Sequence, residues 1–200
     1  KAIDPSPIIA CIGVLKDYSK AITMKIKRKD SVLFLAGERK DELGGSVYYD
    51  INDAIGAKIP ITNFEKERNM IYAIIDAIDE GLLLSCHDIS DGGLATAISE
   101  TILGGNADGC IGAQIYLDFS KLRSDKILFS ESSGFVFEVE NKNITKLNDL
   151  FRFYGLHLIK IGKTTKKNNL VINHRNKKII NLPISKLKDA WTKGFVEALE

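Results

Sequence analysis

The sequence has few cysteines and no long apolar run. Its three cysteines, Cys11, Cys86 and Cys110, are widely spaced in apolar surroundings, so they form neither a disulfide framework nor a zinc-binding pattern. We interpret them as buried free thiols of a reducing compartment and expect a cytoplasmic location. No apolar run has the length needed to cross a bilayer. We therefore expect neither a membrane span nor a signal peptide.

An excess of charge of one sign is also missing. The chain has 28 basic and 26 acidic residues and a formal net charge of +2. This balance provides no bulk attraction to nucleic acid or to a membrane, and we expect neither as a partner. The 200 residues, 44% of them hydrophobic, suffice for one domain with a core. Because there is no initiator methionine and the opening is proline-rich, we expect a linker from a preceding domain at 1–7 and a single domain at 8–200.

Short apolar runs and helical periodicities follow one another along the chain. The apolar or alternating runs predict strands at 8–15, 32–36, 82–86, 110–119, 135–139, 156–161, 170–173 and 178–182. The run at 82–86 does not alternate, which is typical of a strand that is covered on both faces. Together with the helical segments, these strands predict an α+β fold in which helices pack on a mixed β-sheet.

Capping residues and apolar spacing locate the helices. Residues 17–22 and 47–49 predict short helical turns. Thr62 and Glu65 form a capping box, and Gly81 is a typical helix end. Further helices are predicted at about 92–103 and 144–154, and a last helix is capped by Ser185. The apolar faces that we expect to be buried are Ile71, Ile74, Ile75 and Ile78 in the first long helix, and Leu187, Trp191, Phe195 and Leu199 in the last.

Residues 82–95 read as a strand, a tight polar turn and the start of a helix. Ser90 and Asp91 are good N-cap residues, and Gly92 and Gly93 allow close approach of the backbone to a neighbour or ligand. Free amides and the helix dipole make such a turn suitable for an anion such as phosphate. In an unidentified strand-turn-helix the simpler reading is favoured, in which these residues cap the helix while His87 and Asp88 hold the turn.

Two further loops are rich in small or charged residues. The loop at 38–46 tightens at Gly44, Gly45 and Ser46, and it is either a solvated turn or a flexible lip beside a pocket. The second loop, Ser130-Glu131-Ser132-Ser133-Gly134, separates an apolar patch from the strand at 135–139.

These segments together resemble a known family. The run from His87 to Leu94, the run from Phe129 to Ser133, the Gly-Gly-Ser loop and the opening 5–14 are similar to the C-terminal domain of the large (synthetase) subunit of phosphoribosylformylglycinamidine synthase. That subunit belongs to the aminoimidazole ribonucleotide synthetase-related superfamily. The resemblance covers nearly the whole chain and implies the same α+β domain.

The resemblance implies an ATP-dependent carbon–nitrogen ligase of purine biosynthesis. In that reaction ATP phosphorylates the amide oxygen of formylglycinamide ribonucleotide, and ammonia released from glutamine displaces the phosphate. The implied cofactors are ATP or ADP and Mg²⁺, which needs hard oxygen ligands. The implied partners are the preceding domains of the subunit, a glutaminase subunit, a small bridging subunit and the small-molecule substrate.

The resemblance also implies site residues. Asp88 matches a magnesium ligand, and the implied nucleotide- or phosphate-binding residues are His87, Ser90, Asp91, Gly92, Gly93, Gly44, Gly45, Ser46, Glu131, Ser132 and Ser133. From the residues themselves, Asp88 is equally a structural residue, and His87 is better read as structural. The wording of the motifs fits the second half of the family's subunit, which borders an auxiliary nucleotide site. Gly134 stands where the family tends to have arginine.

No catalytic residue is assigned to this chain, because the family's catalytic histidine and main ATP-binding residues lie in other domains. The chain alone is therefore expected to be inactive. Two alternatives stay open. One is a domain of another ATP-dependent member of the superfamily, of the selenophosphate synthetase or hydrogenase-maturation type. The other is a non-catalytic assembly domain.

Overall fold

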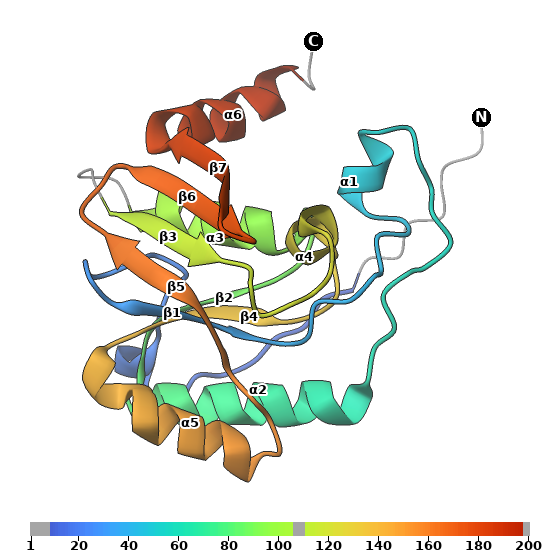
Figure 1. Cartoon of the computed structure of the whole chain (residues 1–200). Coiled ribbons are helices and arrows are strands. Elements are labelled where there is room, and N and C mark those ends of the chain that lie inside the picture. The colour runs from blue at the N-terminus through green and yellow to red at the C-terminus, as the bar shows by residue number, and fades with distance from the viewer. Residues whose placement is uncertain (1–8, 106–110, 198–200) are drawn as a thin grey trace.

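The computed structural model describes residues 9–105 and 111–197, with side chains as far as residue 194 and without that of Gly105. Seven strands form one mixed sheet in the order β2-β4-β1-β5-β3-β6-β7, with helices on both faces (Figure 1). The β3–β6 pair is parallel and the other five pairs are antiparallel. This architecture confirms the expected α+β class.

The element bounds are close to those expected from the sequence. The strands are β1 Val32–Ala36, β2 Leu83–Asp88, β3 Gly112–Tyr116, β4 Phe135–Val139, β5 Ile159–Thr165, β6 Asn169–His174 and β7 Lys177–Pro183. The α-helices are α1 Val47–Asp50, α2 Phe64–Asp79, α3 Gly93–Gly105, α4 Ser124–Phe129, α5 Ile144–Phe153 and α6 Ile184–Glu197. Short 3-10 turns lie at Tyr18–Lys20 and Asn141–Asn143.

The sheet separates two hydrophobic cores. In the central strand β1 all five residues are buried, and successive side chains point to opposite faces. Leu33 and Leu35 pack in the core under α3, α4 and the start of α6. Val32, Phe34 and Ala36 pack in the core covered by α2 and α5. The two layers of helices above and below the sheet are visible in Figure 1.

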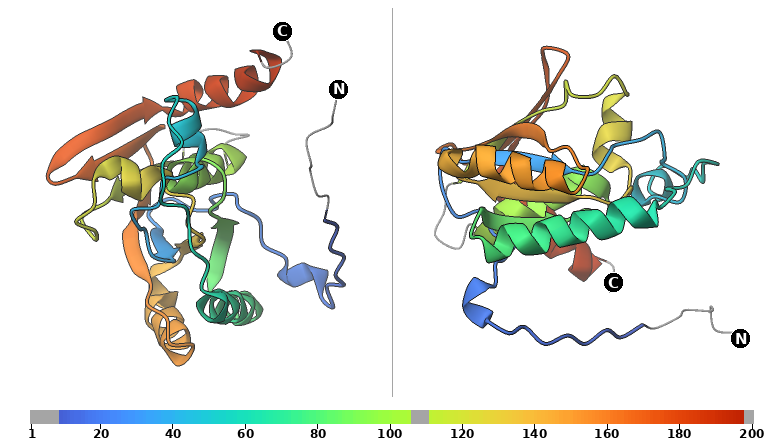
Figure 2. Two further views of the ribbon diagram at one scale, coloured as in Figure 1. Left: turned by 90° about the vertical axis from the view of Figure 1, so that its right-hand side faces the viewer. Right: turned by 90° about the horizontal axis from the view of Figure 1, so that it is seen from below.

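The segment at 9–15 does not form the expected strand. It is extended, its apolar side chains are exposed, and it runs outside the body of the molecule (Figure 2). A strand is stable when it pairs with others, and this segment pairs with none of the described strands. Cys11 is therefore exposed, which corrects its reading as a buried thiol. Cys86 is partly buried, and burial raises its pKa to about 12; Cys110 lies outside the described residues.

The buried face of α2 is offset from the expected one. Met70, Ala73, Ile74 and Ala77 are buried and Ile78 packs partly buried against the same core. Ile71 and Ile75 are each 48% exposed, so two alanines take the places expected for these two isoleucines. The N-cap is also one residue later than expected, because the Asn63 side chain, not that of Thr62, accepts the Lys66 amide at 3.0 Å.

Truncation of α2 side chains tests this face. Ile74→Ala is expected to lower the free energy of unfolding by roughly 2–3 kcal/mol, the lower part of the usual range for a core isoleucine, because Ile74 keeps 7% of its surface exposed. Ile75→Ala, one position further along the same helix, is the matched control and should have a much smaller effect. Urea denaturation of both variants measures the difference, and equal losses would show that the face is assigned wrongly.

The C-terminal part of the chain differs from expectation in three places. Helix α4 was not anticipated before the serine-rich loop. Helix α6 begins at Ile184, so Ser185 lies within it. Trp191 is 61% exposed rather than buried, while Leu187 does pack on the core. Phe195 and Leu199 lie outside the described side chains.

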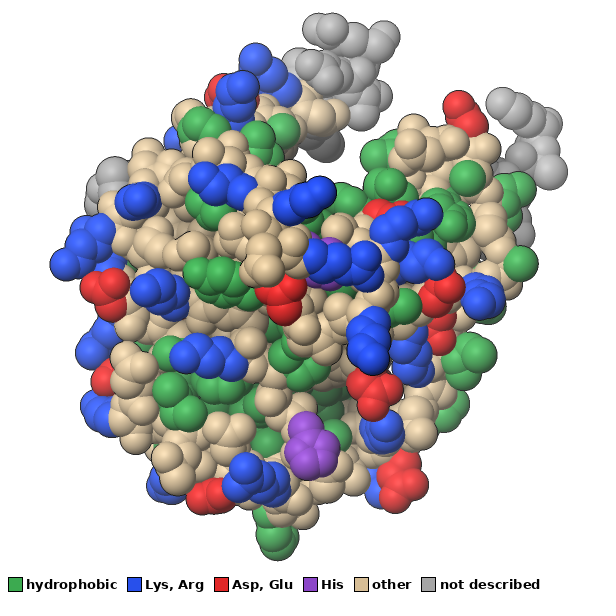
Figure 3. Space-filling view, in the orientation of Figure 1, with side chains coloured by type: hydrophobic (Ala, Val, Ile, Leu, Met, Phe, Trp, Pro, Cys, Tyr) green, Lys and Arg blue, Asp and Glu red, His purple; other side chains and the backbone are tan. Residues whose placement is uncertain are grey.

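The remaining features of the fold are the position of β2, the distribution of surface charge and the character of the helices. The strand expected at 82–86 is β2, which pairs with β4 at the edge of the sheet and with no other described strand. Lys and Arg side chains are interspersed with acidic ones over the face shown in Figure 3. Within 9–105 and 111–197 no helix has the length and hydropathy to span a membrane.

Candidate functional site

The turn between β2 and α3 is closely packed against the loop after α4. Gly92 and Gly93 both have positive φ angles, of 74° and 68°. A Cβ atom on Gly93 would lie 2.7 Å from the Leu128 carbonyl oxygen and 2.8 Å from that of Ser130. Glycine is therefore required at position 93 to let the start of α3 approach the backbone of residues 128–130.

The Glu131 carboxylate joins two of the three predicted loops. Its Oε1 atom accepts the Gly92 amide at 2.9 Å and the Val47 amide at 2.9 Å. The anion-binding position at the start of α3 thus holds a carboxylate of the chain itself, as expected for an exposed helix N-terminus. The Gly92 amide thus donates to Glu131 rather than to a capping side chain of Ser90 or Asp91. Ser90 and Asp91 are exposed.

The Gly-Gly-Ser loop is held by its own neighbours. The amides of Gly44 and Gly45 donate to the carbonyls of Lys58 and Ile55, at 2.7 and 2.9 Å. The Ser46 hydroxyl caps α1 by accepting the Tyr49 amide. Because these amides donate to backbone carbonyls, the loop does not offer them to a phosphate in this arrangement.

The loop at 130–134, the serine loop, is held by hydrogen bonds from a buried arginine. Arg39 donates to the Ser133 carbonyl at 2.6 Å and to the Ser130 carbonyl at 3.2 Å. The Ser132 hydroxyl donates to Glu42 at 3.0 Å, and the Ser133 hydroxyl donates to Glu67. Burial lowers the pKa of Arg39 to about 10, against the opposing charges of Glu67 and Glu42. Arg39 therefore remains cationic at neutral pH.

Sequence reasoning missed Arg39, which belongs to a loop that reads as solvated. Its guanidinium lies where a side chain on Gly134 would project, because a Cβ there would be 2.8 Å from Arg39 Nη2 and 2.6 Å from the Ala36 carbonyl oxygen. An arginine at position 134 would collide with this arrangement. A cation is thus present next to the loop, but Arg39 lies 95 positions before Gly134, in the loop that follows β1.

His87 and Asp88 lie at the open side of the turn. His87 Nδ1 is 3.1 Å from Asp88 Oδ1, and its Nε2 is 3.0 Å from Glu100 Oε2. The imidazole is thereby held between two carboxylates, which suits a structural role. The Asp88 carboxylate is 60% exposed.

Asp88, to which the resemblance assigns magnesium, is a lone exposed carboxylate. Among the described residues no group of three His, Cys, Asp or Glu side chains could hold a metal ion. Magnesium is often bound by one or two carboxylates, with phosphates and water completing its shell, so an exposed lone carboxylate suits a metal that arrives with a nucleotide.

The three loops therefore lie together at one end of strands β1, β2 and β4. The Ile89 amide donates to the Gly134 carbonyl at 2.8 Å, which ties the turn to the serine loop, and Glu131 ties both to Val47. The structure brings the predicted residues into one region. It engages the amides of Gly44, Gly45 and Gly92 internally and leaves Asp88, Ser90 and Asp91 exposed.

Comparisons with known proteins agree on a family. The model of the AIR synthase related protein, C-terminal domain, matches residues 28–175. The PurL subunit of phosphoribosylformylglycinamidine synthase from Methanothrix thermoacetophila is 40% identical over 199 residues, which are 99% of this chain and 25% of that protein. The same subunit from Caldanaerobacter subterraneus subsp. tengcongensis is 35% identical over 96% of this chain and 26% of its own length. The chain spans about a quarter of the length of these curated relatives.

Solved structures share the fold. Thermotoga maritima PurL complexed with FGAR superposes with a TM-score of 0.71 and 21% identity over 84% of this chain and 29% of that one. The same protein complexed with ATP gives a TM-score of 0.69 and 20% identity, with 84% and 27% covered. Escherichia coli HypE, a hydrogenase maturation protein, gives 0.57 and 13%, with 82% and 52% covered.

Proposed function

The chain belongs to the family of AIR synthase related protein C-terminal domains, and from this premise we propose that it is the C-terminal domain of an ATP-dependent phosphoribosylformylglycinamidine synthase subunit. The observation that carries the proposal is the similarity to PurL subunits over nearly the whole chain, at 40% identity in one relative. The more distant likeness to HypE, at 13% identity, reflects the shared fold, so the hydrogenase-maturation alternative has less support.

In the complete subunit, this domain forms one wall of a nucleotide site at the turn after β2. We assign Asp88 as the residue that would hold magnesium, which would neutralise phosphate charge when bound. Glu131 and Arg39 hold the loops of this wall in place through their hydrogen bonds to backbone groups. Because Glu131 occupies the anion position of the turn, Asp88 would be the residue through which this wall holds magnesium, and the metal would supply positive charge for a phosphate. PurL structures carrying ATP and ADP support nucleotide binding in such a protein.

The proposed setting is cytoplasmic purine biosynthesis. The chain works with the preceding domains of its subunit, and a complex titled PurLQS from Thermotoga maritima supports assembly with further subunits. We assign these partners to a glutaminase that supplies ammonia and a small bridging subunit. The substrate, formylglycinamide ribonucleotide, and the chemical step belong to the complete subunit, and this domain supplies positioning.

The test is calorimetry of ADP with magnesium on the complete subunit carrying Asp88→Asn. This change keeps the size and one oxygen but removes the charge, so we expect the affinity to fall by about tenfold or more, and the magnesium dependence to weaken. Asp189→Asn, an exposed residue of α6, is the matched control and should bind as the parent does. Unchanged affinity and magnesium dependence in Asp88→Asn would make Asp88 structural and remove this proposal for the site.

A further inference from the structure

A cavity of about 370 Å³ opens beside the serine loop, and its lining includes no residue of the turn at 88–93. Its walls come from the end of β1, the segment leading into α2, the first turns of α2, the serine loop and the segment between α5 and β5. This volume is in the range of small-molecule sites. Among the residues that line it, Ser132 and Ser133 also belong to the nucleotide-binding set that the resemblance implies.

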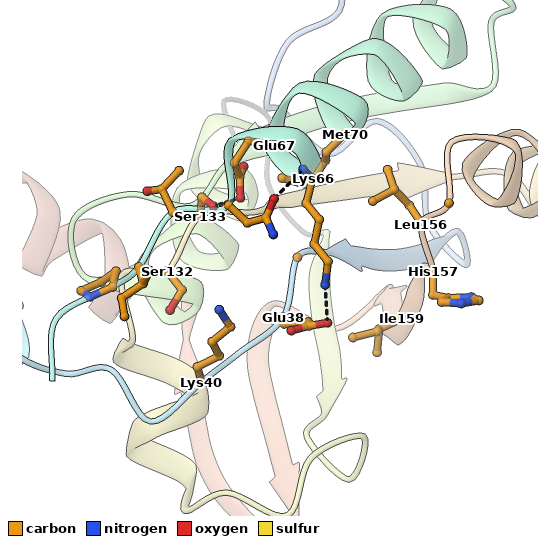
Figure 4. A pocket seen from close by; sticks show the side chains of 16 residues that line it. Glu38, Lys40, Lys66, Glu67, Met70, Ser132, Ser133, Leu156, His157 and Ile159 are labelled. Atoms are coloured by element: carbon orange, nitrogen blue, oxygen red, sulfur yellow. Dashed lines mark hydrogen bonds and ion pairs between the residues drawn. The ribbon is translucent and has the colours of Figure 1, made fainter.

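One wall of the cavity is apolar. Met70 is buried in the first turns of α2, and Leu156 and Ile159 approach from the segment after α5 (Figure 4). Pro60 and Ile61 add apolar surface from the segment before α2. A hydrocarbon or aromatic group placed here would lose contact with water, which is favourable in proportion to the apolar area covered.

The polar wall carries charges of both signs in equal number. Lys66 Nζ lies 3.3 Å from Glu38 Oε1, and in Figure 4 this pair extends from α2 to the end of β1 beside the cavity. Lys40 lies on the same side, 3.9 Å from Glu42. Glu67, the second acidic residue of the lining, accepts the Ser133 hydroxyl and is opposed by the buried charge of Arg39. The lining therefore favours a ligand with no net charge that carries both signs.

The Lys66–Glu38 pair is easily opened. Its side chains are 62% and 67% exposed, and such surface pairs contribute little to stability. An α-amino acid has an ammonium and a carboxylate close together on one carbon. Inserted between the two side chains, it would give its carboxylate to Lys66 and its ammonium to Glu38, so that four alternating charges replace two.

We propose that this cavity binds a free α-amino acid with an apolar side chain, whose charged ends lie between Lys66 and Glu38 and whose side chain covers Met70, Leu156 and Ile159. The site goes beyond the proposed function and does not depend on it, because it needs neither a nucleotide nor Asp88. Its wall includes Ser132 and Ser133, so occupancy would be sensed directly by the loop that borders the turn.

The experiment is a titration of the 200-residue chain with L-leucine and L-phenylalanine, followed by amide chemical shifts. Shifts are expected at cavity residues with saturation in the millimolar range. N-acetyl-L-leucine lacks the ammonium and L-leucinamide lacks the carboxylate, and each should bind about tenfold more weakly or worse, because each loses one charge-assisted contact. Equal binding of the three compounds would overturn the zwitterion assignment, and no saturating shift with either amino acid would remove the site.

Variants separate this site from its competitors. Glu38→Gln and Lys66→Gln should each weaken leucine binding, whereas a site for anions would bind more tightly after Glu38→Gln. Lys188→Gln, on α6, is the control for loss of a distant lysine. Asp88→Asn should leave leucine binding unchanged, so failure of the proposed nucleotide site and failure of the cavity are told apart. The exposed positions 38 and 66 should tolerate substitution, and thermal denaturation checks that each variant is folded.

Discussion

Replacing Gly93 by alanine is expected to lower the free energy of unfolding by about 4 kcal/mol, the largest effect of any single change considered for this chain. Two costs add. An alanine at a φ of 68° is strained by roughly 1–2 kcal/mol. Its Cβ would also lie within 2.9 Å of three backbone atoms of residues 128–130. Crowding in a well-packed site costs about 1–3 kcal/mol, and the backbone neighbours cannot turn aside as a flexible side chain could.

Gly81 provides the matched control. Its φ of 65° is nearly the same, but a Cβ there would meet no atom within 4 Å. Gly81→Ala should therefore show the conformational cost alone, about 1–2 kcal/mol. Guanidinium denaturation of both variants measures the difference. If the two alanines cost the same, the close contact between α3 and the loop after α4 is not what requires glycine at position 93.

The local elements could be predicted because they depend on near neighbours in the sequence. The runs at 32–36 and 135–139 became β1 and β4 with the expected bounds, since nearly all residues of these inner strands are apolar. The predicted buried face of α2 differs from the observed one because Ala73 and Ala77 pack against the sheet. A search for hydrophobic periodicity gives an alanine less weight than an isoleucine, even where the isoleucine is exposed.

The candidate site could be predicted in part. The segments came from a resemblance, and the structure places them side by side. What could not be read from the sequence is how they are connected, because each connection joins distant positions. Arg39 reaches carbonyl groups 91 and 94 residues further along, and nothing in a charged loop marks one arginine as the buried one. The sequence marks the turn at Gly92 as suitable for a phosphate. In the structure the Gly92 amide donates to the carboxylate of Glu131, which lies 39 residues further along the chain.

That carboxylate makes the second prediction. Glu131→Ala is expected to lower the free energy of unfolding by about 3 kcal/mol, because it removes two hydrogen bonds to a charged group, each worth roughly 1.5–3 kcal/mol. The lower end of that range applies to both bonds, because Val47 is exposed and Glu131 is partly exposed. The loss of stability should be seen first as local opening of the two loops that Glu131 joins. The Gly92 and Val47 amides both donate to Glu131, so their hydrogen exchange should accelerate together although they lie in different loops.

Glu131→Gln is the matched variant, because it keeps one oxygen acceptor and removes the charge. It should retain part of the protection of both amides and cost less than the alanine. The Leu156 amide, which donates to the Phe151 carbonyl at 2.9 Å on the opposite side of the sheet, is the internal reference and should exchange at the parental rate. A residue kept for contact with substrate would behave differently, because its removal leaves the free protein as stable as before. Unchanged exchange at Gly92 and Val47 in Glu131→Ala would thus show that the carboxylate is not the clamp between the two loops, and it would return Glu131 to the role of a ligand-binding residue.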